Sequence, residues 1–299
     1  MMKKILAGAL FLTLSGSILT ACSDVQATDQ LIHEKLMAQS SLQTSQTQTQ
    51  QAQEINDQES QQISGDLPPQ TQETPAPKDA STIVPIIMFH YVRTVEAAKD
   101  PLGYNLSIEP QQFEKILQYL STNGYHTIHV EDIIKGWVPP KSIILTFDDG
   151  YEDFYTTARP LLQKYGFTAS EGIITGKMDG VQYMSPDQVK EIDKEGFEIL
   201  SHTVHHTDLN TDPNQKSEIF DSKAYLEKLL NKTIDTLVYP AGRYDNTTLG
   251  FTKDAGYKVA LTTKPGYAEL SGDMLQLHRI RIDNRDGYLG FIKKLNFIP

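Results

Sequence analysis

From residue 82 onward, short apolar segments alternate with longer amphipathic ones, and few architectures accommodate that pattern. Apolar runs such as "SIILTF" (142–147) have the length and composition of buried strands. Between such runs, residues 107–125 place Phe113, Leu117 and Leu120 at helical spacing. Alternating strands and helices predict an α/β architecture with a parallel sheet. In such folds the functional side chains gather at the C-terminal ends of the strands.

The whole segment 82–299 reads as one folded domain. The strands that we predict in it are 82–89, 126–130, 142–147, 167–176, 197–201, 236–242 (a strand with a turn), 257–263 and 278–283. The predicted helices are 107–125, 151–166, 185–196 and 217–233. No internal repeat is visible.

The first 81 residues have a different character. "MMKK" followed by an apolar stretch predicts a signal peptide over 1–21, and "LTAC" resembles a bacterial lipobox that ends at Cys22. The resemblance implies lipidation of Cys22 and a mature protein anchored to the extracytoplasmic face of the cell membrane. A plain signal peptide or an uncleaved anchor is the alternative. Residues 22–81 are rich in Gln, Ser and Thr, which predicts a disordered linker.

Charge and cysteine content exclude some classes of function. The net charge is −11, and nine acids against two bases between 23 and 80 supply −7 of it. The acidity therefore belongs largely to the linker and says little about the substrate. A net negative charge disfavours binding to the phosphate backbone, so we expect no nucleic-acid partner. With a single cysteine, the chain forms neither an intrachain disulfide nor a cysteine-based zinc finger.

Two acidic residues follow one of the predicted strands in "TFDDG". Adjacent carboxylates on an extended backbone point in different directions, so Asp149 can bind a metal while Asp148 faces a substrate. Gly150 permits a sharp turn after them. The alternative interpretation is that one of the two aspartates caps the helix that begins near Tyr151.

Three histidines lie close together in "SHTVHH" (201–206), after another predicted strand. His202 and His206 are four residues apart, so one helical turn would place them on the same face as two ligands of one divalent ion. His205 would lie on another face. Two histidines with one aspartate suit Zn²⁺, and also Co²⁺ or Ni²⁺. Histidines with purely structural roles are the alternative.

These motifs resemble the polysaccharide deacetylases of carbohydrate esterase family 4, also called the NodB-homology domain, over residues 82–299. "IIMFHYV" (86–92), "IEPQQFEKILQYL" (108–120) and "VYPAGRYDN" (238–246) are most similar to the branch of poly-N-acetylglucosamine deacetylases. The resemblance implies a distorted (β/α) barrel of about seven strands that holds a metal-dependent N-deacetylase site.

Site roles follow from the same resemblance. It implies Asp149, His202 and His206 as metal ligands, Asp148 as general base, His278 as general acid and the backbone N–H of Ala241 as an oxyanion donor. Three protein ligands leave coordination positions open for water and an acetamide oxygen.

The chain departs from the family pattern in places. Val238 stands where many members carry an arginine that holds the catalytic aspartate, and Arg279 or Arg281 is the candidate replacement. Glu171 stands where a large apolar residue is usual, and it either lines the cleft or faces solvent. His90, Tyr239 and Arg279 are candidate substrate contacts; a buried structural role is the alternative for each.

Together these observations predict a hydrolase that removes N-acetyl groups from N-acetylglucosamine-type residues of a cell-wall or extracellular polysaccharide. We expect it to act as a monomer. The alternatives are a catalytically weak carbohydrate-binding lipoprotein on the same fold and an O-acetyl esterase. The sequence does not distinguish peptidoglycan, poly-N-acetylglucosamine and chitin oligomers as the polymer.

Overall fold

The computed structural model describes residues 83–296 of the chain. The predicted signal peptide (1–21), the lipidation site Cys22 and the linker (22–81) lie outside these residues, so those predictions stay predictions. Within 83–296, every helix is too short or too polar to cross a membrane.

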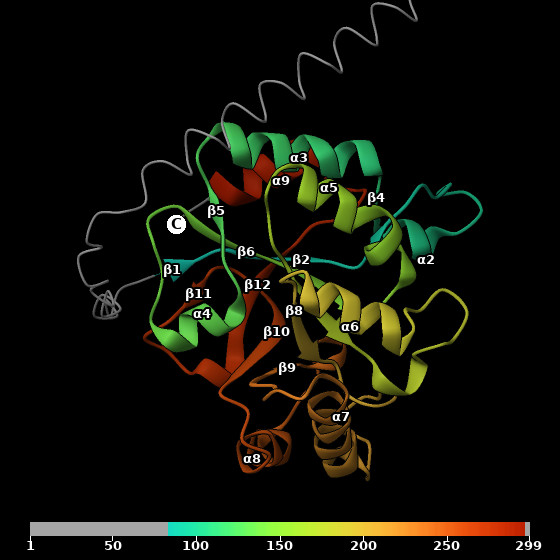
Figure 1. Ribbon diagram of the computed structural model, residues 1–299, viewed down its shortest axis with the longest axis vertical. Helices are drawn as coiled ribbons and strands as arrows, with labels where there is room; N and C mark the ends of the chain where they lie inside the picture. Colours follow the sequence, from blue (N-terminus) through green and yellow to red (C-terminus); the bar gives the residue numbers. More distant parts are fainter. Residues whose placement is uncertain (1–82, 297–299) are drawn as a thin grey trace, which may run out of the picture. The chain divides into compact units, whose positions relative to one another are not determined.

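The core of the fold is a closed barrel of seven parallel strands (Figure 1). In spatial order they are β2 (Ile86–Phe89), β12 (Leu277–Arg281), β10 (Val259–Pro265), β9 (Thr236–Val238), β8 (Glu198–Ser201), β7 (Ser170–Ile173) and β6 (Ser142–Asp149), and β6 pairs with β2 to close the ring. β5 (His126–Thr127) pairs with the first residues of β6, outside the ring. The predicted α/β barrel is therefore confirmed.

Two short pairs of strands flank the barrel. β1 (Ile83–Val84) pairs antiparallel with β11 (Ala268–Glu269). β3 (Tyr91–Val92) pairs in parallel with β4 (Ser107–Ile108), just beyond the C-terminal end of β2.

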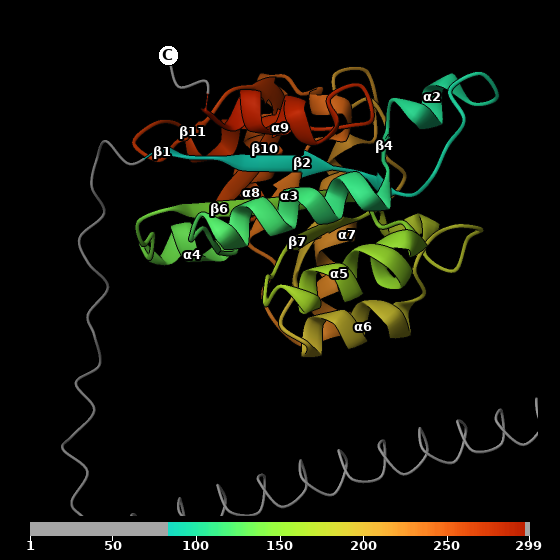
Figure 2. The same ribbon diagram turned by 90° about the horizontal axis from the view of Figure 1, so that it is seen from above.

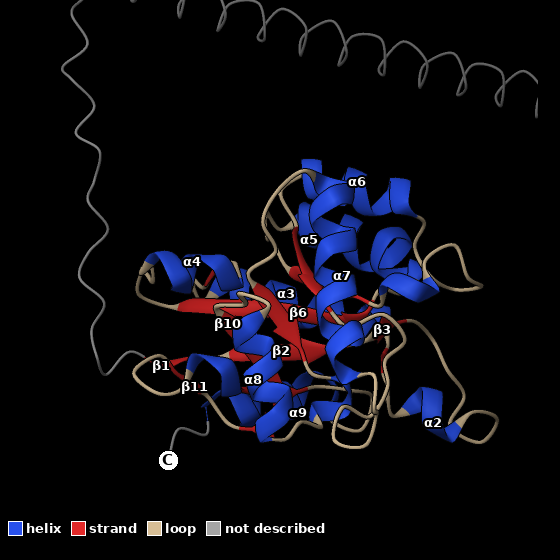
Figure 3. Cartoon of the chain, turned by 90° about the horizontal axis from the view of Figure 1, so that it is seen from below, coloured by secondary structure: helices blue, strands red, loops and turns tan. Residues whose placement is uncertain are grey.

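Helices surround the strands, as Figures 2 and 3 show from two sides. They are α2 (Pro101–Tyr104), α3 (Pro110–Thr122), α4 (Val130–Lys135), α5 (Arg159–Lys164, after a π-helical turn at Phe154–Ala158), α6 (Pro186–Lys194), α7 (Gln215–Leu230), α8 (Asn246–Asp254) and α9 (Gly287–Asn296). The four predicted helices correspond to α3, α5, α6 and α7. Sequence reasoning missed the other four, and the strand predicted at 126–130 ends early because α4 begins at Val130.

Alternation along the strands separates two apolar clusters. Side chains such as Ile86, Ile144 and Leu261 fill the barrel interior, whereas the intervening ones, such as Ile87 and Leu145, pack against the helices. α4 closes the N-terminal end of the barrel, because its Val130 and Ile133 belong to the interior cluster.

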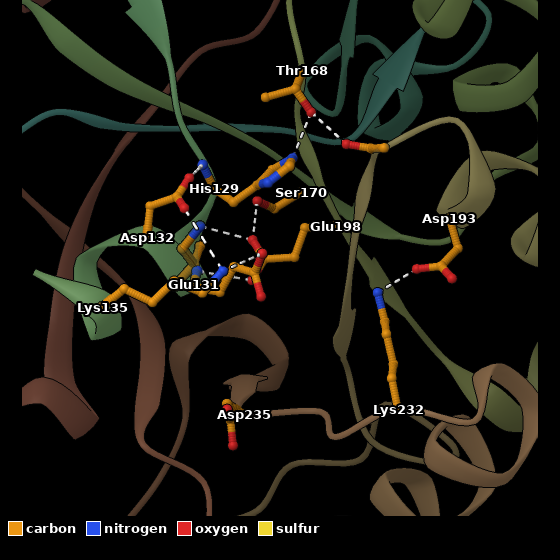
Figure 4. A network of polar contacts seen from close by, with 12 residues as sticks. His129, Glu131, Asp132, Lys135, Thr168, Ser170, Asp193, Glu198, Lys232 and Asp235 are labelled. Carbon is orange, nitrogen blue, oxygen red and sulfur yellow. Dashed lines mark hydrogen bonds and ion pairs between the residues drawn. The ribbon is translucent and has the colours of Figure 1, made fainter. Parts of the chain in front are cut away.

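A buried carboxylate attaches α4 to the barrel (Figure 4). Glu198, at the start of β8, accepts hydrogen bonds from the backbone N–H groups of Val130 and Glu131 and from the Ser170 hydroxyl. The first N–H groups of a helix lack partners within the helix, so this carboxylate satisfies two of them.

Candidate metal centre

Three predicted ligands converge at the C-terminal end of the barrel. Their ligating atoms, one each from Asp149, His202 and His206, all lie within 4.8 Å of one another. The Oδ1 atom of Asp149 is 3.4 Å from Nε2 of His202 and 3.5 Å from Nε2 of His206. Ligands at ~2.0–2.1 Å from a tetrahedral zinc ion lie about 3.3 Å apart, which is close to both of these Asp149–histidine distances. Within 83–296 these residues form the one cluster of this kind.

The first two ligands stand at the C-terminal ends of β6 and β8, which β7 separates in the barrel. His202 directly follows β8, and its Nδ1 atom lies 2.8 Å from the carbonyl oxygen of Val238 in β9. That contact directs Nε2 toward Asp149. A histidine that binds a metal through one ring nitrogen usually makes such a contact with the other. Asp149 ends β6 with a φ of 87°, and Gly150 follows with a φ of 79°. The left-handed backbone turns the Asp149 carboxylate away from Asp148, toward the histidines.

His206 reaches the site from a loop, and the predicted helical turn is wrong. Residues 202–208 contain no helix, and Thr203 and His206 have φ values of 67° and 60°. The hydroxyl of Thr203 accepts a hydrogen bond from the His206 N–H. Two reversals of the chain bring the histidines together, with ring centroids 4.8 Å apart.

A buried glutamate from α7 holds this loop. Glu218 accepts hydrogen bonds from the backbone N–H groups of Val204 and His205, and its other oxygen lies 2.6 Å from Nδ1 of His205. The His205 ring otherwise points to solvent, away from the ligands. Sequence reasoning missed Glu218; an acid on the apolar face of a predicted helix was the available signal.

Asp148 is held by an arginine from β12, which is separated from β6 by β2. Arg279 donates to both carboxylate oxygens at 2.7 Å, and both side chains are buried. The guanidinium also donates to Thr146 Oγ1 and to the carbonyl of Thr262. Val238 stands where the resemblance led us to expect an arginine that holds this aspartate. Arg279, rather than Arg281, therefore makes that contact. The substrate contact predicted for Arg279 is wrong, because its fully buried guanidinium contacts only protein groups.

The charges in the site keep its two carboxylates ionised. Burial would raise the pKa of Asp148, but the Arg279 guanidinium lowers it below its usual range. Burial would also raise the pKa of Asp149, but His202, His90 and His206 lower it. Burial and the neighbouring His202 lower the pKa of His206 to about 4, whereas the carboxylates of Asp149 and Asp148 raise the pKa of His202 despite its burial. An ionised carboxylate and a neutral imidazole are the forms that bind a cation, so a cation would displace any proton on His202.

His90 is the remaining imidazole at this end of the barrel. It and Asp148 directly follow the paired residues Phe89 and Phe147 of β2 and β6, so the two lie at the same level. His90 is half-buried, and its pKa is lowered by burial, which the carboxylates of Asp148 and Asp149 oppose. The structure thus places His90 at the same end of the barrel as Asp148, and its predicted contact with a substrate stays a prediction.

The prediction that His278 is the general acid is wrong. His278 lies near the start of β12, whereas the site lies at the strand ends. Its neighbour Arg279 points into the barrel toward Asp148, so alternation turns His278 outward, where it is exposed. Arg281 pairs with Met88, and Met88 pairs with Thr146. His278 precedes Arg281 by three residues and Asp148 follows Thr146 by two, so about 16 Å along the strands separates them.

Three other predicted residues have clear places. Tyr239 is fully buried in the outer cluster and stacks on Tyr244, so the predicted substrate contact is wrong. Ala241 is exposed after β9, with a φ of 52°, at the site end of the barrel. Glu171 neither lines a cleft nor faces solvent, because it is fully buried on β7 behind Asp149.

Comparison with known proteins identifies the family. The sequence profile of the polysaccharide deacetylases matches residues 135–260. YxkH of Bacillus subtilis, provisionally described as a polysaccharide deacetylase, is 33% identical over 206 residues, covering 67% of this chain and 71% of YxkH. The poly-beta-1,6-N-acetyl-D-glucosamine N-deacetylase of Staphylococcus aureus is 27% identical over 214 residues, covering 64% of this chain and 72% of that protein.

Solved structures agree. The deacetylase PplD of Streptococcus pyogenes, in complex with acetate, is 32% identical with a TM-score of 0.68, and the match covers 72% of this chain and 99% of PplD. A polysaccharide deacetylase of Bacillus cereus is 30% identical with a TM-score of 0.65, covering 72% of this chain and 70% of that structure. The chain therefore belongs to the polysaccharide deacetylases, a family of hydrolases.

Proposed function

We propose that this protein is a metal-dependent hydrolase that removes N-acetyl groups from N-acetylglucosamine-type residues of a cell-wall or extracellular polysaccharide. We further propose that a lipid on Cys22 anchors it to the extracytoplasmic face of the cell membrane. The observation that carries the enzymatic proposal is the convergence of Asp149, His202 and His206 beside a carboxylate, Asp148, that belongs to no metal-ligand cluster.

Each residue of the site has a distinct task. A divalent cation held by Asp149, His202 and His206 would supply an acidified water and polarise the acetamide carbonyl. Asp148, kept ionised by Arg279, accepts the proton of the attacking water. Arg279 engages both carboxylate oxygens, so it fixes the direction of the remaining lone pairs.

His90 replaces His278 as the proposed general acid. Its ring lies level with Asp148 and is only half-buried, so it can give a proton to the departing sugar nitrogen. The backbone N–H of Ala241, at the same end of the barrel, is the proposed donor to the oxyanion. The product is a free amine, which adds a positive charge to the polymer near neutral pH.

Two relatives of this protein support the substrate class. The Staphylococcus aureus relative is a poly-beta-1,6-N-acetyl-D-glucosamine N-deacetylase, and PplD was solved with acetate, which is the product of deacetylation. Both facts are consistent with an N-acetylated glycan as the substrate of this protein.

The test is acetate release from poly-N-acetylglucosamine, peptidoglycan and chitin oligomers, with and without a chelator. We expect release from at least one glycan, its loss on chelation, recovery with Zn²⁺ or Co²⁺, and loss of at least a hundredfold in Asp148→Asn. Stoichiometric metal without acetate from any glycan would favour the carbohydrate-binding alternative. Acetate without a new amine would indicate an O-acetyl esterase.

A further inference from the structure

A buried acid that has no role in the reaction lies directly behind the metal ligand Asp149. Glu171 is on β7, paired between Phe147 of β6 and Ile199 of β8, and it is fully buried. Phe147 and Ile199 belong to the outer apolar cluster. Within 83–296 the Oε2 atom of Glu171 is buried without a hydrogen-bond partner. Burying such a carboxyl is unfavourable, so the group that donates its one hydrogen bond indicates its role.

That hydrogen bond goes to the turn that carries the metal ligand. The Oε1 atom of Glu171 accepts from the backbone N–H of Gly150 at 3.0 Å. Asp149 has a φ of 87°, a left-handed conformation that is unfavourable for residues other than glycine. Such a backbone persists only where its surroundings hold it.

The turn is held on its other side by backbone groups. The carbonyl of Gly150 accepts from the N–H of Met184, and the N–H of Glu152 donates to the carbonyl of Gln182. The carbonyl of Gly150 is therefore held by Met184, in the loop before α6, and its N–H is held by Glu171. Removal of the Glu171 carboxyl would leave this N–H without its acceptor.

Burial also explains why the charge of Glu171 does not repel the site. Burial, with the nearby carboxylates of Asp148, Asp153 and Asp149, raises the pKa of Glu171 well above its usual range. A neutral carboxyl still accepts the Gly150 hydrogen bond through its carbonyl oxygen.

Asp153 provides a comparison within the same region. Its Oδ2 atom accepts the backbone N–H of Val92 at 2.8 Å, and its Oδ1 atom is buried without a partner. It therefore resembles Glu171 in chemistry, but the segment it holds carries no metal ligand.

We propose that Glu171 is a positioning residue for the metal ligand Asp149, holding the left-handed turn at 149–150 through the Gly150 N–H so that the carboxylate faces His202 and His206. The inference rests on the proposed metal site but not on the identity of the substrate.

Zinc affinity of the full chain, measured by calorimetric titration, tests this role. Glu171→Met removes the acceptor and keeps an apolar side chain of similar length, so we expect zinc to bind roughly 10–100-fold more weakly. Glu171→Gln keeps an acceptor oxygen, and we expect its affinity within about threefold of wild type. The metal-free Met variant should unfold at the same temperature as wild type or higher, because a buried carboxyl is removed.

Asp153→Leu is the matched control, and its zinc affinity should stay within about threefold of wild type. Wild-type zinc affinity in Glu171→Met would overturn the proposal. So would an equal loss in the Met and Gln variants, or failure of the Met variant to fold, because the carboxyl would then serve the core as a whole. If wild type released no acetate while the Met and Gln variants still differed in zinc affinity, the proposed function would fail and this inference would stand.

Discussion

At the scale of single residues, Asp148 and Arg279 form a buried pair whose two parallel hydrogen bonds leave the carboxylate one orientation. Such fork-to-fork geometry is specific to arginine, since a lysine offers a single charged point. The arginine comes from β12, on the far side of β2 from the strand that carries Asp148. It therefore acts on the reaction only through the carboxylate that it holds.

Arg279→Lys should separate this positioning role from substrate binding. The charge remains, which limits the loss of stability, but the bidentate contact does not. We expect kcat to fall roughly 10–100-fold while KM changes less than about threefold, because the guanidinium does not reach the substrate. Steady-state kinetics on an active glycan measure both values. A rise in KM at constant kcat would show that Arg279 contacts the substrate after all.

The exchange of His278 for His90 as general acid gives a second prediction. His90→Gln should lower kcat about 10²–10⁴-fold, the usual contribution of a positioned acid. Zinc affinity should stay near wild type, because His90 is not in the ligand cluster. His278→Gln is the control and should keep full activity, since its ring faces outward at the other end of the strand. The opposite ranking of the two variants would restore His278.

At the scale of elements, the loop 203–206 and helix α7 act as one unit. Glu218 of α7 receives three hydrogen bonds from this loop, which places His206 beside Asp149 and His202. The loop has no regular secondary structure of its own, so the helix supplies its rigidity. Metal ligands depend on such outer contacts for their orientation.

Glu218→Leu tests this coupling. The apolar side chain accepts no hydrogen bond, so the backbone N–H groups of Val204 and His205 both lose their partner. We expect zinc to bind about 10–100-fold more weakly, as measured by competition with a chromogenic chelator. His205→Ala removes only the contact of the exposed His205 ring with Glu218 and keeps the backbone hydrogen bonds. It should change the zinc affinity less than about threefold. Equal effects of the two variants would mean that the His205 ring holds the loop.

Elements with long, regular patterns were predictable from sequence, and the ligand loop was not. α3 shows helical apolar spacing, and β6 has eight consecutive buried residues, so both were predicted within a few positions. Four-residue spacing suggested a helix for His202 and His206, yet two left-handed residues produce the same convergence. Spacing alone does not reveal backbone reversals at non-glycine residues. His278 was misplaced because an alternating strand does not tell which of its residues face inward.

At the scale of the whole molecule, inward-facing side chains form layers along the barrel. Asp148 and His202 lie at the C-terminal end, Arg279 and Thr146 lie below them, and apolar residues such as Ile144 and Leu200 fill the interior. At the N-terminal end, Glu198 binds the first N–H groups of α4 (Figure 4). The stability of the fold and the chemistry of the site therefore depend on ionisable groups at opposite ends.

This separation predicts a pH effect on stability that is independent of the metal. Burial raises the pKa of Glu198 to about 7, although three hydrogen-bond donors oppose the shift. The folded protein then holds a proton that the unfolded chain releases near 4.5, so this group's contribution to stability falls as pH rises from about 4.5 to 7. Relative to wild type, Glu198→Gln should gain about 2–3 kcal/mol of unfolding free energy between pH 5 and pH 8. Urea unfolding of the metal-free proteins at both pH values measures this gain, with Glu131→Gln on the exposed side of the same helix end as the control. Parallel pH curves for wild type and Glu198→Gln would show that the helix N–H groups keep Glu198 ionised throughout.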